Sequence, residues 1–200
     1  MEEVVHVSRE QKVQLVRADL EKTKHEYVHK EGGGYRPNGV FVLYKIIEGK
    51  PKYLLTLANN PTVIEKDEWF LAQGGVGVDP LEENESLEDN LFQEVNTELS
   101  ITQDQLQNIQ VGIVDPFSVD YKPGRNNFRN KKNPEKGKRY YFSSAEYIGD
   151  EKLLHNDEIH SYRWGDYDET VAKLQGHSNE KSIRALDALE KVNASLEENL

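Results

Sequence analysis

The chain has 200 residues, which suits a single domain, because chains of this length bury roughly 70% of their unfolded surface. It carries 25 basic and 36 acidic residues, a net charge of -11, and 36% of its residues are hydrophobic. We therefore expect an acidic, soluble globular protein whose bulk charge repels nucleic acid. It contains no cysteine, which excludes disulfides, thiolate nucleophiles and zinc-thiolate sites.

The N-terminal segment MEEVVHVSREQK lacks the basic start and apolar run of a signal peptide. No segment approaches the ~20 consecutive apolar residues of a membrane span. We therefore expect a cytoplasmic protein without a membrane partner.

A helix is predicted from Ser8 to about Lys30. Ser8 and Gln11 form a capping-box pattern, and apolar residues follow at helical spacing: Val13, Val16, Leu20 and Tyr27. The glycines at 32–34 then break the helix. This predicts an N-terminal helical extension, residues 1–33, before a main domain of residues 34–200.

The main domain begins with two predicted strands, GVFVLYKI and KYLLTLA, which EGKP joins in a tight turn. Further strands are predicted at WFLAQGG, IQVGIVDPF, RYYFSSAEYI and IHSYRW, and helices near 168–174 and 179–196. Strands and helices mix without regular alternation, which predicts an α/β (α+β) fold with a mixed sheet flanked by helices. The two terminal helices could mediate dimerisation, so we expect a monomer or a homodimer.

A helix over residues 86–99 is predicted from the cap Ser86–Asp89 and from an apolar ridge of Leu87, Leu91, Val95 and Leu99. Glu94 and Glu98 lie on another side of this helix, where like charges four residues apart repel by a few tenths of a kcal/mol. Either they point into water or a cation lies between them. The preceding pair Gly74–Gly75 would let a backbone carbonyl approach a ligand, and Mg²⁺ favours such oxygen ligands. From the residues alone, a solvated face and a metal site both remain open.

The exception to the acidic background is the stretch KPGRNNFRNKKNPEKGKR, residues 122–139. It has eight basic residues and one acidic residue, 8 minus 1 or +7, so the rest of the chain carries -18. It is either a solvated connection or a clamp for the phosphates of a polyphosphate or nucleic acid.

The stretch GGVGVDPLEENESLEDNLFQEVNTELSI, residues 74–101, resembles a Nudix box. That pattern is a Gly, five residues, a Glu, seven residues, then Arg-Glu-apolar-any-Glu-Glu-any-Gly-apolar. The flanking segments GYRPNGVFVL, EWFLAQGG, KGKRYYF and EIHSYRW are similar to the Nudix branch of RNA 5′-pyrophosphohydrolases and diadenosine polyphosphate hydrolases. The resemblance covers residues 34–174 and implies a Nudix-type α/β/α sandwich.

The resemblance also implies a site. Metal ligands would be Glu94, Glu98, Glu158 and the carbonyl of Gly75, with Mg²⁺ or Mn²⁺ as the ion, and Glu98 or Glu158 helping to activate the attacking water. The implied substrate-binding residues are Arg36, Lys138 and Arg139. The implied reaction is hydrolysis of a nucleoside diphosphate linked to another group, such as a dinucleoside polyphosphate, a nucleotide or a 5′-triphosphorylated RNA end.

The sequence also departs from the Nudix pattern. Nine residues instead of five separate Gly75 from Glu85, and Gln93, Thr97 and Ser100 stand where the pattern has Arg, Glu and Gly. These departures motivate a second hypothesis, a catalytically degenerate Nudix fold that binds a nucleotide or a protein. A purely structural interaction domain is a third, but it leaves the basic stretch and the glutamate pair unexplained.

Overall fold

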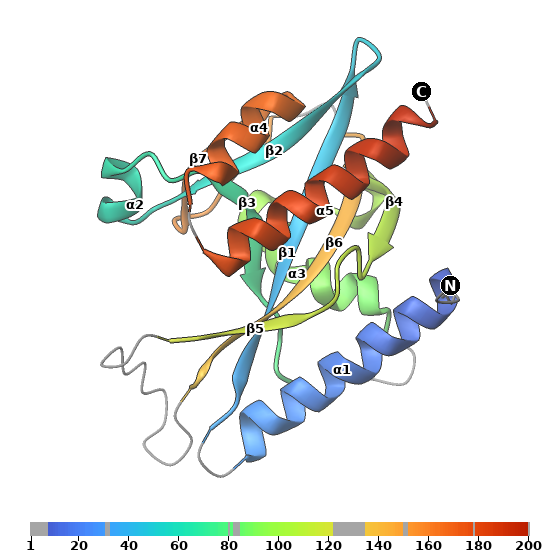
Figure 1. Ribbon diagram of the computed structural model, residues 1–200, viewed down its shortest axis with the longest axis vertical. Coiled ribbons are helices and arrows are strands. Elements are labelled where there is room, and N and C mark those ends of the chain that lie inside the picture. The colour runs from blue at the N-terminus through green and yellow to red at the C-terminus, as the bar shows by residue number, and fades with distance from the viewer. Residues whose placement is uncertain are drawn as a thin grey trace, which may run out of the picture.

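The computed structural model describes residues 8–30, 33–79, 81, 85–121, 135–149, 152–177 and 179–199 (Figure 1). The α-helices are α1 (Arg9–His29), α2 (Pro61–Glu65), α3 (Leu87–Leu99), α4 (Tyr167–Gln175) and α5 (Glu180–Glu197), and a 3₁₀ turn spans Gln103–Gln105. The strands are β1 (Tyr35–Ile47), β2 (Lys50–Ala58), β3 (Phe70–Gly75), β4 (Leu106–Val111), β5 (Phe117–Asp120), β6 (Gly137–Tyr147) and β7 (Ile159–Gly165).

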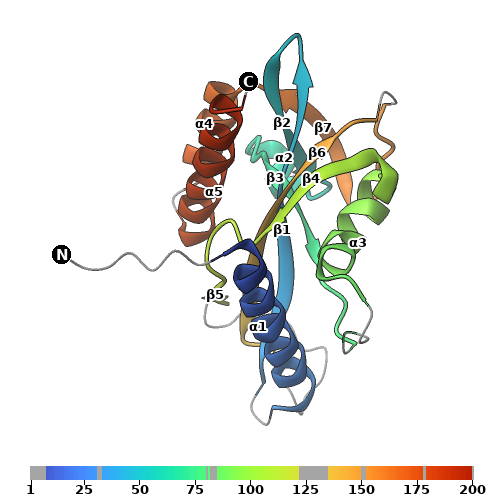
Figure 2. The same cartoon turned by 90° about the vertical axis from the view of Figure 1, so that its right-hand side faces the viewer.

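The strands form one seven-stranded sheet in the order β4-β6-β1-β3-β2-β7, and β5 pairs with β6 beyond this path. β1 and β6 are parallel, whereas the other pairings are antiparallel. The sheet is therefore mixed, and helices cover both of its faces (Figure 2). This confirms the predicted α/β/α sandwich.

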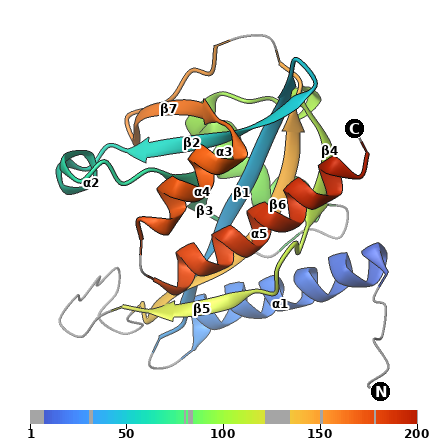
Figure 3. The same cartoon turned by 45° about the horizontal axis from the view of Figure 1, so that its top comes forward.

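The alternation of side chains along β1 creates two hydrophobic cores. Phe41 and Leu43 belong to the cluster that contains residues of α1 and α3, whereas Val40 and Val42 belong to the cluster with residues of α4 and α5. Successive side chains of a strand point to opposite faces, so a strand buried on both sides is apolar throughout. Figure 3 shows α5 crossing β1 and β6.

The predicted helix starts are confirmed. Ser8 and Gln11 make the capping box of α1, and the Ser86 side chain accepts a hydrogen bond from the Asp89 N–H at the start of α3. The apolar ridge of α3 is buried, with exposed fractions of at most 1% for each member: Leu87, Leu91, Val95 and Leu99. Burial of this ridge fixes which side of α3 faces the sheet, and hence where its polar residues point.

Two elements differ from the predictions. The segment IQVGIVDPF is not one strand, because β4 ends at Val111, the backbone turns at Gly112 with a φ of 67°, and β5 begins at Phe117. Helix α2 was not predicted, although Asn60 caps it and Pro61 occupies its first position, a known helix-start pattern.

The basic stretch lies only partly within the described residues. Residues 122–134 fall outside them, and residues 137–139 are not a loop but the start of β6. No helix in the described part of the chain is long and apolar enough to cross a membrane. The division into residues 1–33 and 34–200 stays a prediction.

Candidate functional site

A cavity of about 210 Å³ opens where several strand ends meet α3. The first residues of β1 and β6, the last of β2 and β3 and the first of β7 contribute to it, together with the C-terminal half of α3. Its lining includes five of the predicted site residues, which are far apart in sequence: Arg36, Gly75, Glu98, Lys138 and Glu158. We call this cavity the carboxylate pocket.

One residue, Asn156, links the backbones of the two acidic residues of this pocket. Its backbone N–H donates to the carbonyl of Glu98 at 2.9 Å, and its side-chain Oδ1 accepts from the Glu158 N–H, also at 2.9 Å. Glu98 is 8% exposed, whereas Glu158 is exposed on the loop before β7. The loop is also fastened to the end of β2, because the Asn59 N–H donates to the Glu158 carbonyl at 2.8 Å. The helix and the loop thus present two acids from a defined backbone.

The basic side of the carboxylate pocket comes from the parallel pair β1 and β6. Arg36 and Lys138 are Cα partners in this pairing and line the pocket together. Arg139 is the next residue of β6, so its side chain points to the other face of the sheet. There its guanidinium forms a bidentate ion pair with Asp19 of α1, at 2.7 and 2.8 Å, and hydrogen bonding to Asp19 raises the pKa of Arg139. The structure therefore does not bring Arg139 to the pocket.

Asn38 and the glycine pair also line the pocket. The side-chain Nδ2 of Asn38 donates to the Gly74 carbonyl at 2.9 Å, which fixes the orientation of the amide, while its Oδ1 is buried and has no hydrogen-bond partner among the described residues. Asn38 is only 3% exposed. The Arg36 side chain packs directly over Gly75. A Cβ atom added at residue 75 would lie 3.0 Å from Cζ of Arg36.

Within the described residues, no three Asp, Glu, His or Cys side chains come together as a metal site. Glu94 lies in α3 one turn before Glu98, but its side chain is outside the described set. Mg²⁺ is commonly held by one or two carboxylates, with water and substrate phosphates completing its shell. Glu98 and Glu158 meet this requirement. The buried Oδ1 of Asn38, which has no hydrogen-bond partner among the described residues, is a further oxygen atom in the lining of the pocket. The residues present therefore fit Mg²⁺ or Mn²⁺.

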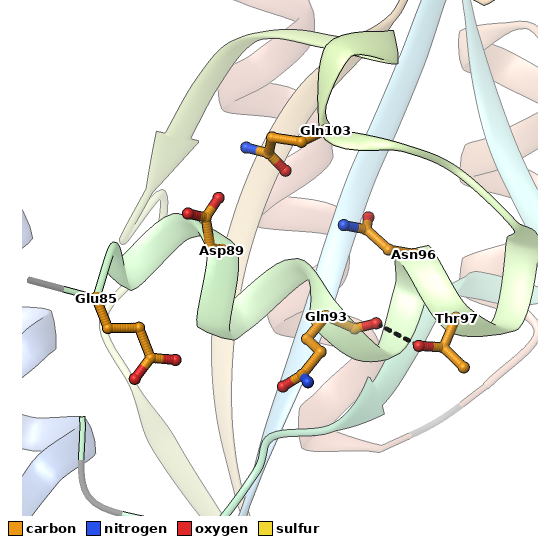
Figure 4. A pocket seen from close by; sticks show the side chains of 6 residues that line it. All are labelled: Glu85, Asp89, Gln93, Asn96, Thr97 and Gln103. Atoms are coloured by element: carbon orange, nitrogen blue, oxygen red, sulfur yellow. Dashed lines mark hydrogen bonds between the residues drawn. The ribbon is translucent and has the colours of Figure 1, made fainter. Parts of the chain in front are cut away.

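Two of the three residues that depart from the Nudix pattern line a different cavity. Gln93 and Thr97 line a separate cavity of about 480 Å³ on the outer side of α3, together with Asp89 and Asn96 (Figure 4). The Thr97 hydroxyl donates to the Gln93 carbonyl of its own helix at 2.9 Å. Thr97 and Glu98 thus line different cavities, and Thr97 does not substitute for a box carboxylate in the carboxylate pocket.

A buried lysine of α1 holds the start of α3 in place. Lys24 is 2% exposed, and its ammonium donates to the Asp79 carbonyl at 3.0 Å and to Oδ1 of Asn90 at 2.9 Å. The Asn90 amide in turn donates to Glu85 at 2.7 Å. Burial lowers the pKa of Lys24, and the nearby Glu85 and Asp79 oppose this effect. Glu85 thus belongs to the hydrogen-bond network that holds the start of α3.

Sequence reasoning missed Asn38, Asn156 and Lys24. Asn38 lies inside the segment GYRPNGVFVL that carried the resemblance, and Asn156 lies two residues before the segment EIHSYRW. Only their positions relative to the carboxylates could have singled them out. Lys24 has no local signal, because its partners lie 55 and 66 residues away in sequence.

The sequence matches no protein-family model and no curated protein sequence. Solved structures do match. A C. elegans Ap4A hydrolase in a binary complex has a TM-score of 0.54 at 16% identity, over 82% of this chain and 98% of that one. The E. coli dihydroneopterin triphosphate pyrophosphohydrolase has a TM-score of 0.53 at 15% identity, over 80% and 98%.

A third similar structure is the Nudix domain of Shewanella oneidensis NrtR, which was solved with ADP ribose. Its TM-score is 0.51 at 13% identity, over 79% of this chain and 88% of that one. These similarities extend over most of the chain, and they show its fold.

Proposed function

Because the chain has the Nudix fold, we propose that it is a Nudix-type pyrophosphohydrolase that cleaves a nucleoside diphosphate linked to another group. The substrate would be a dinucleoside polyphosphate, a nucleotide or a 5′-triphosphorylated RNA end, and Mg²⁺ or Mn²⁺ the cofactor. The observation that carries the proposal is the convergence of two carboxylates and two cations, from four separate elements, in one pocket. The similar structures named for the hydrolysis of Ap4A and of dihydroneopterin triphosphate support it.

The cations give the pocket its affinity for phosphate. Arg36 has a planar guanidinium that can bind two phosphate oxygens at once, and Lys138 adds a compact positive charge beside it. Their placement on neighbouring strands would hold the phosphate chain along the edge of the pocket, with its reacting phosphorus toward Glu98 and Glu158.

The carboxylates would hold the ion and receive the proton. A divalent ion held by Glu98, Glu158, Glu94 and the Gly75 carbonyl would supply Lewis acidity to the phosphates and lower the pKa of a water. Glu98 or Glu158 would accept the proton of the attacking water. A bond forms between the water oxygen and phosphorus, the phosphoanhydride bond on the opposite side breaks, and the second phosphate leaves with its oxygen. Arg36 and Lys138 would stabilise the charge that develops on the phosphate oxygens.

A second candidate is a Nudix fold that binds a nucleotide or a protein partner without hydrolysis. The positions of Gln93 and Thr97 favour this second candidate. Both line the outer cavity of α3 and neither lines the carboxylate pocket, so the arginine and the glutamate of the Nudix pattern have no replacement there. A binder would hold nucleotide without product formation and without a requirement for metal.

Hydrolysis of a substrate panel with Mg²⁺ or Mn²⁺ tests the proposal. The panel contains diadenosine tetraphosphate, ADP-ribose and a 5′-triphosphorylated RNA, and the variants are Glu98→Gln and Glu158→Gln, with Glu190→Gln on the exposed side of α5 as the matched control. We expect both pocket variants to lose at least about tenfold in kcat/KM and the control to behave as the parent. Equal turnover by the parent and both pocket variants would remove this assignment. Nucleotide binding without turnover by the parent would favour the second candidate.

We further expect the protein to act in the cytoplasm, as a monomer or a homodimer. Cell fractionation tests the location, and light scattering of the purified protein gives the mass that decides between one and two copies.

A further inference from the structure

A second cavity, of about 190 Å³, adjoins the carboxylate pocket. The two cavities share three lining residues, Thr56, Ala58 and Gln73, so they are neighbours along one surface of the sheet. The remaining lining of the second cavity comes from the start of β3, the α2 region and the start of α5: Val63, Glu68, Phe70, His177, Asn179 and Lys181. We call it the α5 pocket.

Lys181 places a positive charge at the boundary between the two pockets. It is the second residue of α5, and its ammonium lies 3.9 Å from the centroid of the Phe70 ring and 5.8 Å from that of Tyr140. Its Nζ donates to Oε1 of Gln73, a residue of the shared wall, at 3.1 Å. Within the described part of the chain, no carboxylate forms an ion pair with this ammonium.

The surroundings of Lys181 disfavour its charge. Burial is the main cause that lowers the pKa of Lys181 to about 8, the charge of Lys138 lowers it further, and Glu68 opposes both. Lys138 lines the carboxylate pocket, and Gln73 lines both pockets. The two ammonium groups thus belong to two adjoining pockets that share Gln73, and their charges repel each other. An anion between them would relieve this repulsion and accept charge-assisted hydrogen bonds from both.

We propose that this junction is an anion subsite, in which Lys181 and Lys138 bind a phosphate group of the substrate beyond the one that reacts near Glu98 and Glu158. This inference rests on the proposed function, and it narrows the substrate class. The substrate would carry a phosphate chain long enough to run from the carboxylate pocket past Gln73, as a dinucleoside polyphosphate does. A nucleoside diphosphate linked to a neutral sugar would leave Lys181 without its ligand.

A nucleobase fits the junction less well than a phosphate. Phe70 lines the α5 pocket, but its side chain is buried, the Lys181 ammonium lies over its ring, and His177 meets it edge-on with centroids 5.9 Å apart. A charged group that binds the ammonium leaves this arrangement intact, whereas a stacked base would have to displace it.

Calorimetric titration with inorganic tripolyphosphate at pH 7 tests the subsite without requiring turnover. The variants are Lys181→Met, which removes the charge at similar length, and Lys181→Arg, which keeps it. Lys191→Met, at an exposed position of the same helix, is the matched control. We expect Lys181→Met to bind roughly tenfold to a hundredfold more weakly than the parent, and the other two variants to remain close to it. Inorganic pyrophosphate, which is shorter, should show a smaller difference.

Parent-like affinity of Lys181→Met for tripolyphosphate would overturn the inference, and so would the absence of tripolyphosphate binding by the parent. An equal loss in Lys181→Met and Lys181→Arg would also overturn it, because packing and not charge would then be responsible. The proposed function is tested separately. If the parent hydrolyses no nucleotide but still binds tripolyphosphate in a way that depends on the charge of Lys181, the anion subsite is supported and the proposed hydrolase activity is refuted.

Discussion

The replacement Gly75→Ala is a sharp test of how the candidate site binds phosphate. The backbone of Gly75 lies outside the left-handed region, so an alanine fits the local conformation. The added Cβ, however, would lie 3.0 Å from Cζ of Arg36 and closer still to Nη2, whereas ordinary contacts are 3.4–4 Å. The obstacle is the end of a flexible side chain, and we therefore expect Arg36 to move and the fold to persist.

The size of the effect follows from the displacement. The guanidinium must withdraw by about 1 Å, which is more than the width of the 2.7–3.2 Å range of a hydrogen bond. Charge-assisted hydrogen bonds contribute about 1.5–3 kcal/mol, so their complete loss would raise KM by roughly 10- to 150-fold. Arg36→Ala should show this full loss, and Gly75→Ala should approach it, with the thermal unfolding midpoint little changed.

A double-mutant cycle for hydrolysis of diadenosine tetraphosphate measures this coupling. If Gly75→Ala acts through Arg36, it adds almost nothing in the Arg36→Ala background. Gly77→Ala is the matched control, because a Cβ there would lie 3.8 Å from Gln93, an ordinary contact. The reasoning is refuted if Gly75→Ala raises KM equally in both backgrounds, or if it leaves KM unchanged.

Four further predictions concern other parts of the molecule. Arg139→Met should lower the free energy of unfolding by about 1–2 kcal/mol, since it breaks the ion pair with α1, and should leave KM unchanged in the same kinetic assay. Ser100→Gly should raise the free energy of urea unfolding by about 0.5–1 kcal/mol, because residue 100 caps α3 with a φ of 52°, and Ser100→Ala should bring no gain. Asn156→Ala should lower kcat by about tenfold by freeing the Glu158 loop, whereas Asn156→Asp, which keeps an acceptor oxygen, should lower it less. Tripolyphosphate affinity should fall as the pH rises through about 8, because Lys181 then loses the charge that it carries at lower pH, and Lys181→Arg should lack this component.

Most of the sheet, and every α-helix except α2, could be predicted from the sequence because their signals are local. Capping residues marked the starts of α1 and α3, and the period of the apolar residues distinguished strands from helices. The prediction failed between β4 and β5, where the apolar run continues through a turn at Gly112. A run of this kind gives no local sign that the chain changes direction.

The candidate site was only partly predictable. Arg36, Glu98, Lys138 and Glu158 came from the order of motifs along the chain, and the structure brings them into one pocket. Arg139 could have been separated from Lys138 by strand alternation, had the start of β6 been recognised. The roles of Asn156 and Lys181 depend on contacts between elements far apart in sequence, which no spacing within one segment reveals.

The central claim is that Glu98 and Glu158 form a centre for a divalent ion in the carboxylate pocket. Anomalous diffraction from a crystal soaked in Mn²⁺ tests this most directly. We expect a manganese peak between the two carboxylates, within coordinating distance of both. Diffraction that shows manganese elsewhere, or none at these carboxylates at millimolar concentration, would contradict it.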